Sequence, residues 1–202
     1  MNDGDSVQNY RMSFSVGGLM LNESLVIADA YHPGETWARA RDRLLAHGVS
    51  SLPKLASQTR ALREVYDRIG YLSDTEREYL SAEADRAEQQ AMVWLAVCRT
   101  YRFVYEFAVE VISERYQSWR LDLGHEVFDR FLAEKAESDP GLAELSASTC
   151  AKLRQVLFRI LREAGLRSVE GRIQPIWLSV RMKRLIEESN PADLRVFPGN
   201  GG

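Results

Sequence analysis

Hydrophobic residues recur along most of the chain at the three- and four-residue spacing of amphipathic helices, whereas the alternating pattern of strands is scarce. This periodicity predicts a mainly α-helical protein. In the first part of the chain it predicts three short helices, over about residues 22–31, 36–47 and 54–69. Because short helices with tight connections resemble a helix-turn-helix arrangement, we predict an N-terminal helical lobe at residues 13–72.

The middle of the chain, from Met92 to Trp119, is apolar on nearly every face and carries only scattered arginines and glutamates. A helix with this pattern is typical of a protein interior, because none of its faces suits water. Together with an acidic helix before it, it forms a predicted central region at residues 73–121. Aromatic side chains such as Trp94 and Phe103 could stack on bases, but their spread around the helix favours a place in the core.

Residues 122–189 are predicted to form a second lobe. A helix is expected from about His125 to Ala136, followed by a short helical piece and by a longer basic helix that Ser148 or Thr149 caps. The remaining segments are predicted to be a flexible arm at residues 1–12 and a flexible tail at residues 190–202.

A short β-hairpin is expected after the basic helix. Gly165 can adopt the left-handed conformation that ends a helix. The two-residue turn Glu170–Gly171 lies between Val169 and Ile173, and Pro175 ends the second strand. Since a helix followed by a small hairpin is the arrangement of a winged helix, the predicted fold has two small helix-turn-helix or winged-helix-like lobes joined by a buried central helix.

Charge is segregated along the chain, although the net charge is only −3. The segment from Ser148 to Ile186 holds nine lysines and arginines against two glutamates, which gives +7 and leaves −10 for the rest. Charge distributed in this way indicates a region that binds polyanions within an otherwise acidic protein.

The basic helix has two opposite faces at about 100° per residue. One is a hydrophobic stripe of Leu153, Leu157, Ile160, Leu161 and Ala164. The other, which we call the basic ridge, comprises Ser148, Lys152, Gln155, Arg159 and Arg162. In a winged helix such a ridge would face the major groove of DNA, with Arg167 or Arg172 near the wing tip to meet phosphates or the minor groove. A solvated surface is the alternative interpretation, because exposed helix faces commonly carry lysine and arginine.

The N-terminal lobe gives a weaker version of the same signal. Gln58, Arg60 and Arg63 lie at the start of its third helix, where a helix-turn-helix protein places base-reading side chains. Acidic neighbours leave residues 54–69 at only +2. The alternative interpretation is a plain helical lobe or a protein-docking surface.

Other kinds of chemistry find little support. The apolar run from Ala91 to Cys98 is far shorter than the roughly 18 residues of a membrane span. Two cysteines without ligand spacing, and three dispersed histidines, predict no metal site and favour a reducing, cytoplasmic setting. The histidines are His32, His47 and His125. The "VGG" at 16–18 lacks the lysine and the spacing of a phosphate loop and is interpreted as a hinge. We expect no cofactor, no small-molecule substrate and no enzymatic activity.

Three stretches of the sequence resemble the BrxA family of the BREX bacteriophage-exclusion systems, once catalogued as a domain of unknown function: "SFSVGGLMLNESLVIADAY", "MVWLAVCRTYRFVYEFAVEV" and "TCAKLRQVLFRILREAGL". The resemblance extends from Ser13 to about Ile186. It implies a mostly helical protein with helix-turn-helix-like lobes, likened to the antitermination factor NusB, that binds double-stranded DNA and serves phage defence. No catalytic residues carry over from the family.

Two functions remain open at this point. The first is a DNA-binding subunit, tolerant of sequence, that helps a larger defence assembly engage double-stranded DNA. The second is an adaptor, whose basic face docks an acidic partner protein among the other BREX subunits or binds RNA as the NusB likeness would allow.

Overall fold

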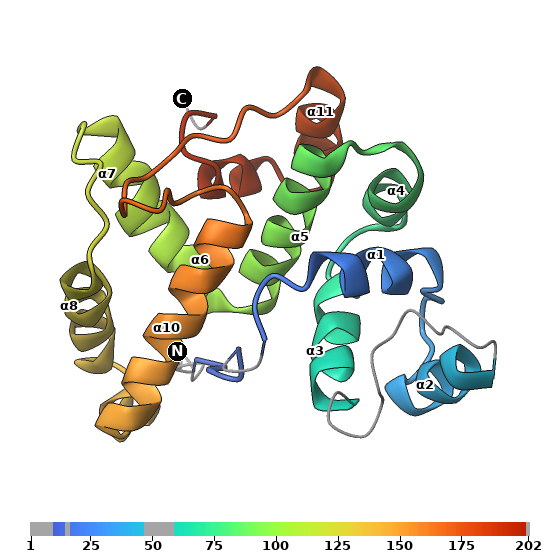
Figure 1. The fold of residues 1–202 in the computed structure, drawn as a ribbon, viewed down its shortest axis with the longest axis horizontal. Helices are drawn as coiled ribbons and strands as arrows, with labels where there is room; N and C mark the ends of the chain where they lie inside the picture. The colour runs from blue at the N-terminus through green and yellow to red at the C-terminus, as the bar shows by residue number, and fades with distance from the viewer. Residues whose placement is uncertain (1–9, 15–16, 47–58, 201–202) are drawn as a thin grey trace, which may run out of the picture.

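The computed structural model describes residues 10–14, 17–46 and 59–200, and all regular elements in these ranges are helices (Figure 1). The prediction of a mainly α-helical protein is therefore confirmed. The N-terminal helices are α1 (Leu21–Asp29), α2 (Trp37–Ala46), α3 (Thr59–Ile69) and α4 (Asp74–Glu78), followed by the π-helix η1 (Tyr79–Glu83). The central ones are α5 (Arg86–Thr100), α6 (Arg102–Glu106), the π-helix η2 (Phe107–Ser113) and α7 (Glu114–Gln117). The C-terminal ones are α8 (His125–Ala136), α9 (Pro140–Ala143), α10 (Ala147–Glu163), α11 (Val180–Ser189) and the 3₁₀-helix η3 (Pro191–Val196).

The predicted β-hairpin is wrong, because residues 166–174 form no strand. The segment makes only two isolated antiparallel bridges, Arg167 with Ile173 and Asp122 with Arg172. Its backbone hydrogen bonds alternate between two neighbours: Ile173 N–H donates to Leu121 O at 2.8 Å, whereas the next residue, Gln174, donates to Leu166 O at 2.9 Å. Each neighbour is joined by a single bridge, and the turn at Ser168–Gly171 follows at once, so neither pairing is long enough to form a strand ladder. The winged-helix description of this lobe does not hold.

The central region is not the single helix that the sequence pattern predicts. Tyr101 adopts an extended conformation (φ −123°, ψ 101°) between α5 and α6, and η2 then follows α6 as a π-helix. Burial follows the prediction despite the break. Trp94 and Phe103 are both 0% exposed, which confirms their place in the core.

Figure 1 shows α5 at the centre of the molecule, with α1 and α3 on one side and α10, α8 and α7 on the other. The two sides share one continuous cluster of buried side chains, which runs from Phe14 to Phe197. Arg99 of α5 links α4 to η3, because its guanidinium contacts Glu76 at 2.6 Å and Asp193 at 2.7 Å. Both carboxylates are buried, so each of them needs this cation as a partner.

The end of the chain differs from the flexible tail that the sequence predicts. Residues 191–196 form η3, and Val196 and Phe197 are fully buried. The indole Nε1 of Trp94 donates to the Val196 carbonyl at 3.1 Å, which fixes η3 against α5. Hydrophobic residues near the C-terminus thus complete the core. Of the predicted arm, residues 1–9 lie outside the described part, and Tyr10 packs onto Phe103.

Candidate nucleic-acid interface

The basic helix α10 has well-defined ends. The Ser146 hydroxyl accepts the Thr149 N–H at 3.2 Å, so Ser146 is the N-cap and the predicted caps at 148 and 149 are wrong by two or three residues. At the other end Gly165 has φ +77°, and the Leu166 N–H donates back to the Leu161 carbonyl at 2.8 Å. This Schellman arrangement ends the helix at the predicted glycine.

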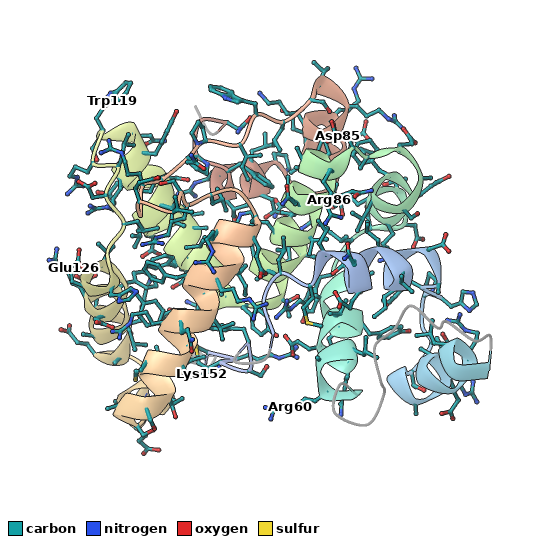
Figure 2. The ribbon with its side chains drawn as sticks, in the orientation of Figure 1. Arg60, Asp85, Arg86, Trp119, Glu126 and Lys152 are labelled. Atoms are coloured by element: carbon teal, nitrogen blue, oxygen red, sulfur yellow. The ribbon has the colours of Figure 1, made fainter. Side chains whose placement is uncertain are left out.

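The two faces of α10 lie as the periodicity predicts. All five residues of the hydrophobic stripe are buried, and all five residues of the basic ridge are exposed. Figure 2 shows Lys152 toward the lower end of α10 in that view. The exposure of the ridge is confirmed, whereas its role in binding stays a prediction.

The cations of the ridge are not equivalent. Arg159 Nε donates to Glu163 Oε1 at 2.7 Å, one turn along the same helix, so its charge is largely compensated. Within the described parts of the chain, Lys152 and Arg162 have no carboxylate partner. An electrostatic interface on this face would therefore depend on Lys152 and Arg162 more than on Arg159.

The two arginines predicted at the wing tip hold the local structure together. Arg167 is half-buried, donates from Nε to the Leu123 carbonyl at 3.1 Å and lies over the Phe158 ring at 4.9 Å. Burial, followed by the nearby charge of Arg162, lowers the pKa of Arg167. Arg172 is exposed but lies 3.7 Å from a carboxylate oxygen of Asp122. Of the two, Arg172 is the more exposed to an anion in solution.

The predicted site in the N-terminal lobe is only partly described. Arg60 and Arg63 are exposed on the first turns of α3, whereas Gln58 lies outside the described residues. Figure 2 shows that Arg60 projects from the lower edge of the molecule, the same edge in that view toward which the Lys152 end of α10 points. Whether α3 and α10 contact one nucleic acid stays a prediction.

The sequence did not reveal the contacts that position the C-terminal end of α10. The remaining carboxylate oxygen of Glu163, Oε2, accepts the Leu19 N–H at 2.7 Å, and the Glu163 carbonyl accepts a hydrogen bond from Gln90 Nε2 at 2.7 Å. Buried Arg68 of α3 donates from Nη1 to the Gly18 carbonyl at 2.9 Å. These partners are 50 to 144 residues apart in sequence, so helical periodicity carries no signal for them.

Two other kinds of site find no support in the described ranges. No three histidine, cysteine or acidic side chains among the described residues gather closely enough to hold a metal ion. Likewise, no described helix combines the length and the apolar character needed to cross a membrane.

In the described ranges, fold and surface define a class: a helical protein with cations along one exposed helix face, of which Lys152 and Arg162 have no carboxylate partner there. The family model named BrxA matches residues 8–190, and the chain belongs to the BrxA family. It is 25% identical over 183 residues to the BREX protein BrxA of Escherichia coli O9:H4 (strain HS), covering 88% of this chain and 84% of that protein. It is 24% identical over 161 residues to the BREX protein BrxA of Bacillus cereus (strain H3081.97), covering 78% of each.

A solved structure has the same fold. The crystal structure of an uncharacterized protein from Magnetospirillum magneticum superposes with a TM-score of 0.76, covering 94% of this chain and 99% of that chain. The two sequences are only 21% identical, so this likeness concerns the fold alone.

Proposed function

We propose that this protein is a non-catalytic component of a BREX phage-defence system, and that it binds double-stranded DNA in the cytoplasm through the basic ridge of α10. Membership of the BrxA family and the names of its relatives support the place in BREX. A single observation supports the DNA surface most directly. All five ridge residues are exposed, and Lys152 and Arg162 have no carboxylate partner within the described chain.

The dimensions of the ridge suit a duplex. Lys152 and Arg162 are ten residues apart, which corresponds to about 15 Å along an α-helix at 1.5 Å per residue. The major groove of B-DNA is about 12 Å wide, so cations at this separation can approach phosphates on either side of the groove. Each neutralised phosphate releases condensed counterions, which favours binding whatever the base sequence.

The expected specificity is low. Lysine and arginine side chains on phosphates position a protein without reading bases. Gln155 is the one amide of the basic ridge, and an amide can pair with the edge of adenine. One such contact supports only a modest sequence preference.

A second candidate, docking of a partner protein, is favoured by exposed apolar side chains away from the ridge. Trp119, Trp177 and Val180 are 85%, 75% and 83% exposed. Large exposed hydrophobic residues are typical of contact surfaces between proteins. Another BREX subunit would be the natural partner, and an adaptor that binds only proteins is the alternative to the DNA-binding function.

Fluorescence anisotropy with labelled duplex DNA, single-stranded DNA and RNA of equal length tests the proposal. We expect the purified chain to bind the duplex more tightly than either single strand, and added salt to weaken that binding steeply. The adaptor function predicts no preference for the duplex over single-stranded DNA or RNA. Tighter binding to RNA than to duplex DNA would instead point to a NusB-like RNA-binding subunit.

A further inference from the structure

A cleft of about 500 Å³ lies where the N-terminal segment of residues 17–23, the start of α5 and the last turns of α10 meet. Three arginines from two helices line it: Arg86 of α5, and Arg159 and Arg162 of α10. The carboxylates in its wall are Glu23 and Glu163. The cleft therefore carries more positive than negative side chains within a confined, concave space.

Gly18 and Leu19 in the wall of the cleft are hydrogen-bonded to side chains of α3 and α10. Glu163 Oε2 accepts the Leu19 N–H at 2.7 Å from α10, and Arg68 Nη1 donates to the Gly18 carbonyl at 2.9 Å from α3. A Cβ atom at Gly18 would lie 2.3 Å from Glu163 Oε2 and 3.0 Å from Arg159 Nε. The backbone passes so close to the side chains of Glu163 and Arg159 that a larger residue at position 18 would require both side chains to shift. Gly18 is thus held against α3 and α10, whereas Val16 of the expected hinge lies outside the described residues.

The three arginine side chains have N–H groups that form no hydrogen bond within the described chain. Arg159 uses Nε for Glu163, at 2.7 Å, which orients its guanidinium. Arg86 uses Nη1 for Asn22 Oδ1, at 3.2 Å across the cleft. Arg162 makes no hydrogen bond or ion pair with any described residue. A guanidinium has five N–H donors, so most of these groups remain available to an oxyanion.

The position of Arg86 also indicates a role other than helix stability. It is the first residue of α5, next to the N-cap Asp85, and the positive end of the helix dipole disfavours a cation there. Figure 2 shows Arg86 beside Asp85 at the upper end of α5. The backbone of α1 adds positive potential to the cleft. This helix begins in the cleft wall, and its N-cap Met20 provides no side chain to accept hydrogen bonds from its first N–H groups.

From this geometry we infer that the cleft binds a phosphate group, held by Arg86, Arg162 and the outer nitrogens of Arg159. Planar guanidinium groups match the oxygens of a phosphate in paired hydrogen bonds. The inference goes beyond the proposed DNA surface, because Arg86 and residues 17–23 lie off the basic ridge and define a discrete site for one group. The phosphate belongs either to a free nucleotide or to the end or backbone of a nucleic-acid strand.

Isothermal titration calorimetry on the full chain tests this, with pyrophosphate, deoxyadenosine 5′-monophosphate and unphosphorylated deoxyadenosine as probes. We expect both phosphate compounds to bind and deoxyadenosine to give no heat. Arg86→Gln and Arg162→Gln should each weaken binding at least tenfold. Lys152→Gln removes a ridge cation that does not line the cleft, so it should leave phosphate binding unchanged.

A parallel titration with duplex DNA identifies the source of the phosphate. If Arg86→Gln weakens duplex binding as well, the cleft holds a strand phosphate, and if the duplex is unaffected, it holds a free nucleotide. The cleft can bind phosphate even if the protein does not bind duplex DNA, and the ridge can bind duplex DNA even if the cleft binds no phosphate. The two proposals can therefore be refuted independently. Absence of heat with pyrophosphate at millimolar concentration, or wild-type affinity in both arginine variants, would overturn the inference.

Discussion

Glu163, in the last turn of α10, accepts the backbone N–H of Leu19 at 2.7 Å across 144 residues of sequence. Its other oxygen holds Arg159. One carboxylate therefore positions both the segment before α1 and a cation of the basic ridge. Without this carboxylate the Leu19 N–H would lose its hydrogen-bond partner.

Glu163→Ala is expected to destabilise the protein by about 1.5–3 kcal/mol, the net contribution of a hydrogen bond to a charged acceptor. Glu163→Gln retains an oxygen that can accept from Leu19, so it should cost less. The measurement is urea unfolding followed by circular dichroism. Glu134→Ala is the matched control, because Glu134 is exposed on α8 and makes no hydrogen bond or ion pair through its side chain within the described chain. Equal stability of Glu163→Ala and the control would show that the Leu19 contact contributes nothing.

Two tryptophans in opposite environments provide a second test. Trp94 is fully buried and donates to the Val196 carbonyl, so Trp94→Ala should cost about 3–5 kcal/mol as a large-to-small change in the core. Trp119 is 85% exposed, and Trp119→Ala should change stability by less than about 0.5 kcal/mol. Thermal melts of the two variants compare identical substitutions. Melting temperatures that fall equally would contradict the burial of Trp94.

The backbone conformation at Trp119 favours glycine, so we expect a glycine substitution there to be more stable than an alanine substitution. Trp119 has φ +58°, and the Arg120 N–H bonds back to the Arg115 carbonyl at 2.9 Å, so the tryptophan occupies the left-handed position at the end of α7. A side chain there is strained by about 1–2 kcal/mol. Trp119→Gly should therefore raise stability above that of Trp119→Ala by up to about 1 kcal/mol, measured by urea unfolding. A lower stability for the glycine variant would refute the strain.

Glu106 is expected to make stability depend on acid. Burial alone would raise its pKa, but hydrogen bonds from Lys135, Tyr10 and Arg102 outweigh burial and lower the pKa of Glu106 below its usual 4.5. A lowered pKa stabilises the folded state above pH 4.5, and this contribution disappears as the pH falls through the folded-state pKa. Glu106→Gln should thus be destabilised by about 1–2 kcal/mol at neutral pH and should approach wild type in acid.

Urea titrations at neutral and acidic pH measure this difference. Glu134→Gln serves again as an exposed control, and we expect the same gap from wild type at both pH values. A gap for Glu106→Gln that stays constant across the acid range would show that its carboxylate has the same pKa in the folded and unfolded chains.

Helical periodicity predicted those parts of the fold that local patterns determine. The range of α8 and the two faces of α10 follow directly from the spacing of their hydrophobic residues. The hairpin prediction failed because residues 166–174 make only single bridges, and one of them joins Arg172 to Asp122, a partner fifty residues away that no turn motif reveals. The ordered C-terminus was missed for a similar reason: Phe197 lies in a short segment between Pro191 and Gly199, and its burial depends on the space beside α5.

The candidate site shows the same division. Sequence patterns identified the exposed ridge, because exposure on a helix follows from its phase. Charge counting could not distinguish Lys152, which is unpaired in the described chain, from Arg159, which Glu163 compensates. Nor could it reveal that Arg86 shares a cleft with Arg162, since the tertiary fold brings α5 and α10 together.

The basic ridge gives the last prediction. Lys152→Ala, Arg159→Ala and Arg162→Ala together should lower duplex affinity by an order of magnitude or more, at least about 1.4 kcal/mol. The log–log salt dependence should flatten by about 0.9 for each phosphate that the variant no longer neutralises. Of the single variants, Arg159→Ala should have the smallest effect, because its charge is already compensated. Thermal stability should hardly change, since the substituted side chains are exposed and the hydrophobic stripe is intact.

A charge-matched control separates this surface from a general effect of net charge. Arg184→Ala, Arg195→Ala and Arg120→Ala remove three exposed cations outside α10 and should leave both affinity and salt slope close to wild type. Arg167→Ala is unsuitable as a binding test, because its contacts with Leu123 and Phe158 make it a structural side chain. If the ridge variant binds duplex DNA with unchanged affinity and unchanged salt slope, the ridge is only a solvated face. Any DNA surface would then have to lie elsewhere, with Arg60 and Arg63 of α3 the first residues to substitute.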